Sequence, residues 1–231
     1  MKLNTYEWGA GDRVAVLIHG IMADHRTWRR LGPLLAERGY RVVGVDLAGH
    51  GASPRGAYDV ESLAEDLLDS VPGEPELAVG HSLGGLVLAR AVRRLRPARA
   101  VFSDPAWHLP LGADGPQVSD FVQAKQLTRP QIRAFNPRWE SVDVDIEMET
   151  LAAWDPDTAP ALAPLAGTDL LPAEPAVPSL VVLADPSFLI SPQKAEVLRS
   201  RGFTVRSVPG AGHTIHRDDF EGFVASLDGW L

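Results

Sequence analysis

One serine lies in a glycine-rich segment whose pattern is typical of a catalytic nucleophile. Segment 80–84 reads G-H-S-L-G, follows the apolar run 77–79 and precedes the apolar stretch 86–91. Small residues at this spacing, between a predicted strand and a predicted helix, let the backbone turn sharply and hold the Oγ atom of Ser82 above a sheet. A hydroxyl is a weak nucleophile at neutral pH, so Ser82 would need a histidine base, an acid behind it and N–H donors for an oxyanion. The same pattern also occurs as a plain turn that opens a helix.

Two backbone amides are candidates for the oxyanion donors. The apolar run 13–18 ends at His19-Gly20, and a glycine there lets the loop backbone approach closely, so that the amide of Ile21 can point above the sheet. The second candidate is the amide of Leu83, at the positive end of the following helix. The side chain of His19 is a candidate for the wall of a substrate pocket.

Three of the seven histidines bear on the choice of a base. His213 lies in a glycine-flanked loop after the last predicted strand, and from this loop its ring can turn back over the sheet. His216 is the alternative, but it lies inside the terminal helix, where a histidine more often forms a salt bridge or caps the helix. His50 lies between two glycines in a turn and is interpreted as a structural hydrogen-bonding residue.

The composition is that of an ordinary globular protein. The chain has 231 residues, of which 45% are hydrophobic and 23% charged, so one large α/β domain with a sizeable core is expected. A net charge of −8 disfavours nucleic acid or an anionic membrane as a partner. The absence of cysteine excludes a disulfide framework, a thiolate metal site and a cysteine nucleophile.

The N-terminal residues lack the apolar core of a signal peptide, and no apolar run approaches the roughly 18 residues of a membrane span. We therefore expect a soluble cytoplasmic protein, either a monomer or a homodimer, whose partner is a small-molecule substrate. No cofactor and no metal ion are expected.

Predicted strands and helices alternate along most of the chain. The predicted strands are 3–8, 13–18, 41–45, 76–79, 99–103, 179–184 and 204–208. The predicted helices are 27–38, 60–71, 83–95, 192–201 and a final amphipathic helix that includes Phe220, Phe223, Leu227 and Trp230. This alternation indicates βαβ units, and so an α/β fold with a mostly parallel central sheet flanked by helices.

The alternation stops between 105 and 177, a proline-rich stretch with helical fragments near 118–127 and 146–154. We interpret 105–177 as an inserted lid, or cap, on a core made of 1–104 and 178–231. Three of the six tryptophans fall in the insertion and are candidates for the pocket wall, although packing of the insertion onto the core explains each of them equally well: Trp107, Trp139 and Trp154.

Three acidic residues lie close together within the insertion. Asp143, Asp145 and Glu147 have neither a histidine nor a glycine turn among them, so they do not match a calcium loop. We interpret them as a solvated helix face rather than a metal site.

Four segments together resemble the α/β-hydrolase family, in the order that the family shows and across nearly the whole chain outside the insertion. They are His19-Gly20, the run 46–53 (D-L-A-G-H-G-A-S), the run 80–84 and the run 210–213 (G-A-G-H). The resemblance implies that Ser82 is the nucleophile, that His213 is the base, and that the amides of Ile21 and Leu83 form the oxyanion hole.

The resemblance leaves the acid of the triad open between two aspartates. In most relatives the acid follows the penultimate strand by three residues, but Ser187 occupies that position here and Asp185 comes two residues earlier. A variant within the family takes the acid from the end of the strand after the nucleophile helix, which here is Asp104. This spacing favours Asp104, with Asp185 as the alternative.

A serine at this position favours acyl transfer and disfavours the family branches that place an aspartate nucleophile there. The expected reaction is hydrolysis of an ester or lactone of a small to medium, largely apolar substrate through an acyl-enzyme. Relatives with the same residues also cleave carbon–carbon bonds or thioesters, act as lyases, or oxygenate without a cofactor, and a few are weakly catalytic small-ligand receptors. The motifs do not separate these alternatives.

Overall fold

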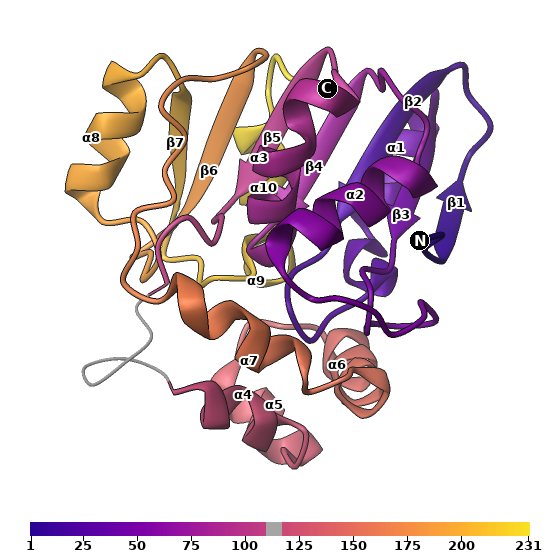
Figure 1. Ribbon diagram of the computed structural model, residues 1–231, viewed down its shortest axis with the longest axis vertical. Helices are drawn as coiled ribbons and strands as arrows, with labels where there is room; N and C mark the ends of the chain where they lie inside the picture. Colours follow the sequence, from indigo (N-terminus) through magenta and orange to yellow (C-terminus); the bar gives the residue numbers. More distant parts are fainter. Residues whose placement is uncertain (110–116) are drawn as a thin grey trace.

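A seven-stranded sheet with strand order β1-β3-β2-β4-β5-β6-β7 forms the centre of the molecule (Figure 1). The computed structural model describes residues 1–109 and 117–231. Strand β1 pairs antiparallel with β3 at one edge, and the other neighbouring strands are parallel. The strands are β1 Thr5–Trp8, β2 Arg13–Ile18, β3 Tyr40–Val45, β4 Leu77–His81, β5 Arg99–Ser103, β6 Ser179–Asp185 and β7 Thr204–Pro209.

Helices cover both faces of this sheet. They are η1 His25–Trp28, α1 Leu31–Glu37, α2 Val60–Ser70, α3 Leu83–Leu95, α8 Pro192–Ser200, α9 Ile215–Asp218 and α10 Phe220–Ser226. Alternate residues of the central strands supply the two cores. Val16 and Ile18 of β2 pack on the side of α2, α3 and α8, whereas Ala15 and Leu17 pack on the side of α1 and α10. Burial on both faces explains why these strands read as continuous apolar runs. The predicted fold class is confirmed.

The first predicted helix differs from the observed structure. In place of one helix over 27–38, a 3₁₀ turn at His25–Trp28 precedes α1, which begins at Leu31. Pro33 lies in the first turn of α1, where the missing N–H is tolerated because the first four amides of a helix have no partner within it. The predicted terminal helix is similarly divided into α9 and α10.

Between β5 and β6 the described residues form a group of short helices beyond one end of the sheet (Figure 1). Helix α6 begins five residues before the predicted fragment, and α5 had no predicted counterpart. Residues 110–116, which belong to the predicted insertion, lie outside the described residues. The helices are α4 Val118–Ala124, α5 Arg129–Phe135, α6 Ser141–Ala153, α7 Thr158–Leu162 and η2 Ala163–Leu165. Among the described residues, no helix has the length and apolarity that crossing a membrane requires.

Two of the three acidic residues predicted to be solvated instead face the core. Asp143 is 3% exposed and accepts hydrogen bonds of 2.8 Å from both Nε and Nη2 of Arg29. Glu147 accepts a hydrogen bond of 2.6 Å from Arg217. Only Asp145 has the exposed position predicted for it, beside Arg129. The interpretation was wrong for Asp143 and Glu147 because their arginine partners come from distant parts of the chain.

Candidate active site

Ser82 occupies the turn between strand β4 and helix α3, with φ 51° and ψ −116°. A residue other than glycine with positive φ is strained, and the glycines on either side make this turn sterically possible. A Cβ atom on Gly80 would lie 2.5 Å from the carbonyl oxygen of Gly84, and one on Gly84 would collide with the backbone of Ile18. The backbone amide of Ser82 donates a hydrogen bond of 3.1 Å to the carbonyl of Ser103, which ties the turn to strand β5.

Asp104 and His213 form a short hydrogen bond at the carboxyl end of the sheet. His213 Nδ1 lies 2.6 Å from Asp104 Oδ2, and the aspartate is fully buried. The other carboxylate oxygen, Oδ1, accepts a hydrogen bond of 3.3 Å from the backbone amide of Ala184. Because the carboxylate accepts from Nδ1–H, it selects the tautomer in which His213 Nε2 carries a lone pair.

The other candidate acid, Asp185, lies elsewhere. It is exposed, and its carboxylate makes no hydrogen bond to a described residue. Its backbone instead supports the loop before His213, since its amide donates to Ala211 and its carbonyl accepts from Gly210. Ser187 accepts hydrogen bonds from the amides of Leu189 and Ile190 through its hydroxyl oxygen. The structure therefore brings Asp104, and not Asp185, to His213.

Two further histidines surround this pair, and both are buried. The Nε2 atom of His216 lies 2.9 Å from Thr27 Oγ1, and its ring stacks on Trp28 at 4.3 Å. His81 donates from Nε2 to the carbonyl oxygen of His213 at 3.0 Å, which anchors the backbone of that loop. Burial holds the pKa of both rings well below the usual range, so both are neutral near pH 7. The anchoring role of His81 had no signal in the sequence, because its acceptor, the carbonyl of His213, lies 132 residues away along the chain.

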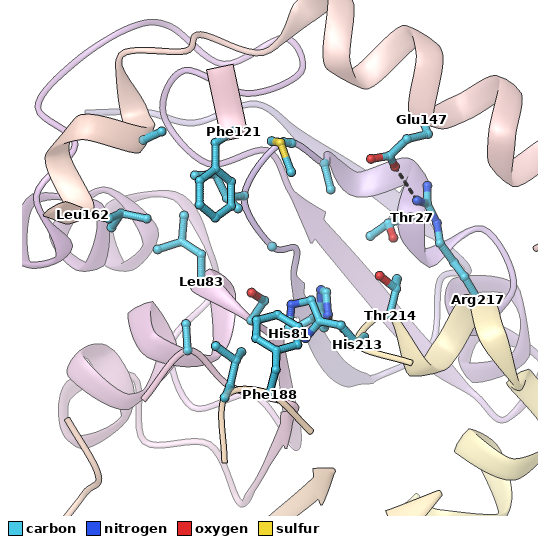
Figure 2. A pocket seen from close by; sticks show the side chains of 18 of the residues that line it. Thr27, His81, Leu83, Phe121, Glu147, Leu162, Phe188, His213, Thr214 and Arg217 are labelled. Carbon is cyan, nitrogen blue, oxygen red and sulfur yellow. Dashed lines mark hydrogen bonds and ion pairs between the residues drawn. The ribbon is translucent and has the colours of Figure 1, made fainter. Parts of the chain in front are cut away.

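Ser82 and His213 line one pocket of about 160 Å³ (Figure 2). Ile21, Leu83 and Trp139 line it too. No described residue accepts a hydrogen bond from the backbone amide of Ile21 or of Leu83. Ser82 Oγ makes no hydrogen bond to His213 in this structure, as is common for such pairs before substrate binds. Sequence reasoning missed several lining residues that come from distant segments: Thr27, Phe121, Glu147, Phe188 and Arg217.

The remaining predicted pocket residues are buried away from this wall. His19 Nδ1 donates to the carbonyl of Gly20 at 2.7 Å, and its Nε2 accepts from the amide of Leu47 at 2.9 Å, so the ring ties two loops together. Trp107 packs against Phe102, with ring centres 4.8 Å apart. The indole of Trp154 donates to Thr158 Oγ1 at 2.6 Å within the insertion.

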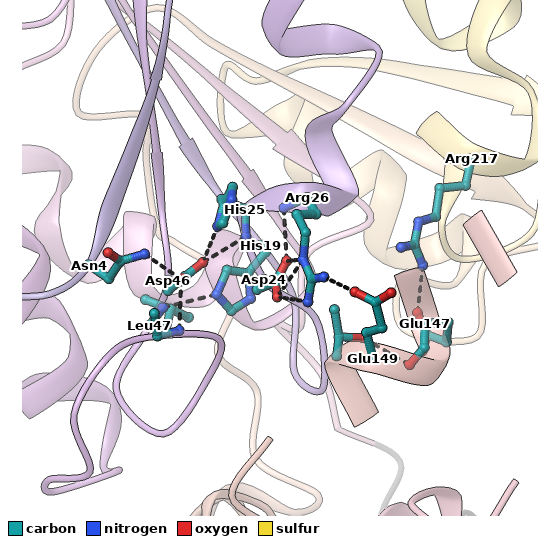
Figure 3. A network of polar contacts seen from close by, with 12 residues as sticks. Asn4, His19, Asp24, His25, Arg26, Asp46, Leu47, Glu147, Glu149 and Arg217 are labelled. Carbon is teal, nitrogen blue, oxygen red and sulfur yellow. Dashed lines mark hydrogen bonds and ion pairs between the residues drawn. The ribbon is translucent and has the colours of Figure 1, made fainter. Parts of the chain in front are cut away.

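A cluster of Asp24, His25 and Asp46 has metal-ligand spacing, but its oxygens are already used (Figure 3). Asp46 accepts hydrogen bonds from Asn4, from the amide of Ala52 and from both the amide and the ring of His25. Burial would raise the pKa of Asp46, but the hydrogen bonds from the ring and amide of His25 and from the amide of Ala52, together with the nearby His19, outweigh it and hold that pKa well below its usual range. The guanidinium of Arg26 occupies both oxygens of Asp24. This cluster therefore acts as an anchor for loops.

Curated relatives match part of this chain. A probable esterase, PIR7A, from Oryza sativa subsp. indica is 42% identical over 101 residues, which cover 40% of this chain and 38% of that protein. The lipase LipV from Mycobacterium tuberculosis is 36% identical over 132 residues, which cover 54% of this chain and 48% of LipV. The chain thus spans less than half the length of these two relatives.

Solved structures match over nearly the whole length. An N-formylmaleamic acid deformylase from Pseudomonas putida S16 superposes with a TM-score of 0.79 at 24% identity, over 96% of this chain and 94% of that one. An esterase from Exiguobacterium antarcticum superposes with a TM-score of 0.77 at 20% identity, over 99% and 94%. At such identities these likenesses concern the fold.

The family comparison covers most of the sheet after strand β1, the serine turn and the loop of His213 together. A sequence model described as the alpha/beta hydrolase family matches residues 15–226. By this match the chain belongs to the alpha/beta hydrolase family.

Proposed function

We propose that this protein is a serine hydrolase that cleaves an ester or lactone of a small to medium, largely apolar substrate through an acyl-enzyme. One observation carries the proposal: His213 forms a 2.6 Å hydrogen bond with the buried carboxylate of Asp104, and His213 and Ser82 line the same pocket. A histidine held in this tautomer by a carboxylate is poised to take a proton from a serine hydroxyl. The esterase and lipase names among the partial relatives support the same class of reaction.

In this mechanism His213 accepts and returns a proton in each half of the reaction, so Ser82 and His213 end in their starting protonation states. Ser82 Oγ attacks the substrate carbonyl while its proton passes to His213 Nε2, and Asp104 stabilises the resulting imidazolium. His213 then gives this proton to the departing alkoxy oxygen, so that an alcohol leaves and the acyl group remains on Ser82. Water repeats the sequence in the second half: its proton goes to His213, its oxygen bonds to the acyl carbon, and the proton returns to Ser82.

The oxyanion of each tetrahedral intermediate would be held by the amides of Ile21 and Leu83. Both residues line the pocket, and neither amide donates to a described residue. Leu83 opens helix α3, whose dipole adds positive potential at that end. Preorganised donors of this kind commonly contribute a factor of about 10²–10³ to kcat.

The helices between β5 and β6 would serve as a lid. Phe121 of α4, Trp139 before α6 and Leu162 of α7 all contribute to the pocket wall, opposite the sheet. These side chains would shield the acyl group from water and favour apolar chains. In this proposal 105–177 is the lid, and 1–104 with 178–231 is the catalytic core.

Covalent labelling and turnover together test the function. A fluorophosphonate probe should label wild-type protein on Ser82, and a short-chain nitrophenyl ester should be hydrolysed with an acyl-enzyme burst. Ser82→Ala should lose both the labelling and more than ~10³-fold of kcat while it keeps the wild-type unfolding midpoint. Turnover by Ser82→Ala within tenfold of wild type would refute the serine mechanism.

A further inference from the structure

The wall of the pocket has an apolar part and a polar part (Figure 2). Leu83, Phe121, Leu162 and Phe188 form much of the apolar part. The polar part is made by Thr27, Glu147, Thr214 and Arg217, and the figure shows Glu147 and Arg217 paired at the side away from Leu162. A purely apolar substrate would leave part of the hydrogen-bonding capacity of this polar wall unused.

Arg217 is held rigidly at this end of the pocket. It belongs to helix α9, which begins two residues after His213, and its side chain is 2% exposed. Its Nη1 atom donates to Glu147 Oε2 at 2.6 Å, and its Cζ atom lies 4.4 Å above the ring of Trp139. The ion pair and the cation–π contact therefore hold the side chain of Glu147 in one orientation at the pocket wall.

The pair has hydrogen-bonding capacity that the described residues leave unused. The Nε and Nη2 atoms of Arg217 are buried, and no described residue accepts a hydrogen bond from either of them. The second carboxylate oxygen of Glu147, Oε1, accepts no hydrogen bond from a described residue, and the Glu147 side chain is 15% exposed. A buried polar group without a partner is costly, so the Arg217 nitrogens favour a ligand that supplies the missing bonds, and the free oxygen of Glu147 can accept one more.

The charge around the pair favours an uncharged ligand group. Glu147 already balances the guanidinium of Arg217, and Asp143 places a second carboxylate oxygen 3.7 Å from Arg217 Nε. Asp143 is itself paired with Arg29, so an incoming carboxylate would find no unbalanced positive charge and would be repelled by Glu147. A hydroxyl or a carboxamide meets no such repulsion and can both donate to Glu147 and accept from Arg217.

We propose that the Glu147–Arg217 pair is a specificity element for an uncharged hydrogen-bonding group, a hydroxyl or carboxamide, carried on the otherwise apolar ester substrate. Glu147 accepts a hydrogen bond from this group through its free oxygen, and Arg217 both holds Glu147 in place and donates a hydrogen bond to the group. This inference rests on the proposed esterase function. It narrows the substrate class to esters or lactones with a polar end group on an apolar chain.

Three nitrophenyl esters of matched chain length test the proposed preference for a polar end group: hexanoate, 6-hydroxyhexanoate and the monoester of adipate. Wild-type protein should favour the hydroxyl ester over hexanoate by about tenfold in kcat/KM, through a lower KM, as expected for one hydrogen bond to a charged group. The adipate monoester should be the poorest of the three. No preference for the hydroxyl ester, or a preference for the carboxylate, would overturn the inference.

The matched variant replaces the whole pair with apolar side chains of similar size, Glu147→Leu with Arg217→Met, because removing one partner alone would leave a buried charge. For this double variant, the ratio of kcat/KM for the hydroxyl ester to kcat/KM for hexanoate should fall to about one. Asp145→Asn, on the same helix but in an exposed ion pair with Arg129, is the control and should keep the wild-type ratio. If the double variant keeps the preference, the pair has only a structural role.

Binding to Ser82→Ala separates this inference from the proposed function. Calorimetry with methyl 6-hydroxyhexanoate and methyl hexanoate should show tighter binding of the hydroxyl ester, and no turnover is needed for this measurement. Selective binding together with no hydrolysis by wild-type protein would refute the esterase function and support the inference. Hydrolysis of all three esters at equal rates would refute the inference and leave the function standing.

Discussion

At the scale of single residues, Ser82 and Asp104 both have a positive φ angle, which is uncommon outside glycine. Their φ angles are 51° and 37°, and neither residue is glycine. Each such residue costs roughly 1–3 kcal/mol, which the surrounding fold must supply. Both residues directly follow parallel strands, β4 and β5, which are neighbours in the sheet. Two of the five residues other than glycine with positive φ in the described part of the chain are therefore the ones that we assign to the nucleophile and to the acid.

The assignment of the acid predicts a large difference between two conservative substitutions. Asp104→Asn should lower kcat by something approaching ~10⁴, because an amide can hold His213 in the wrong tautomer and cannot stabilise its imidazolium. Asp185→Asn should keep most of the activity, since the carboxylate of Asp185 makes no hydrogen bond to a described residue. Steady-state kinetics on one nitrophenyl ester measure both.

Unfolding midpoints serve as the control for this pair. Both variants should stay within about 1 kcal/mol of wild type in stability, because asparagine can accept the local hydrogen bonds that aspartate accepts. A reversed ranking would move the acid to Asp185. Small and equal losses in both variants would mean that Ser82 and His213 act without an essential acid.

The serine turn could be predicted from sequence because its determinants are local: the glycines that permit the turn lie within two residues of Ser82. The environment of His213 depends instead on which strand ends lie beside its loop, and spacing alone left two aspartates open. The tryptophans were harder still. Trp139 lines the pocket whereas Trp107 and Trp154 pack elsewhere, and the difference depends on how the loops and helix ends that carry them pack in three dimensions.

At the scale of elements, ion pairs join helix α6 of the insertion to the core. Arg29 of the segment before α1 binds Asp143 and Glu140, and Arg26 of η1 binds Glu149. Arg217 of α9 binds Glu147 on the same helix. Sequence could not predict these contacts because each partner lies at least seventy residues away. An acidic helix face looks the same whether it meets water or distant arginines.

These ion pairs predict different stability losses at two nearby acidic positions. Asp143→Ala should destabilise the protein by about 3 kcal/mol, near the lower end for breaking a buried pair, because Arg29 is partly exposed and regains some hydration. Asp145→Ala should cost less than about 1 kcal/mol, since its pair with Arg129 is exposed. Urea unfolding at constant pH and salt compares them, and equal losses would contradict the role assigned to Asp143.

At the scale of the whole molecule, the sheet brings together residues from five loops at one end. Sequence predicted a mostly parallel sheet from the alternation of strands and helices, but it did not predict the order of the strands. It did not predict that four of the histidines near this end are packed inside as neutral rings. Burial is the largest cause that lowers the pKa of each of them: His19, His50, His81 and His216.

Those buried rings predict that the protein loses stability on mild acidification. Burial and, to a smaller extent, the nearby His19 lower the pKa of His50 to about 3, whereas an unfolded chain protonates histidine near 6.5. Between these two values the unfolded state binds a proton that the folded state excludes, so stability falls as the pH falls. Each such ring contributes about 1.4 kcal/mol per pH unit, and none of this loss occurs above pH 6.5.

The slope of stability against pH isolates the contribution of His50. Urea unfolding at pH 7.5, 6.5, 5.5 and 4.5 should give a wild-type curve that is flat above about 6.5 and steep below it. In His50→Asn the slope between pH 6 and 4.5 should be shallower by about 1.4 kcal/mol per pH unit, whatever the variant costs at pH 7.5. Asp46 does not interfere in this window, because the stability from its depressed pKa is lost only as the pH falls below about 3.8. An unchanged slope in His50→Asn would mean that the ring takes up a proton in the folded protein.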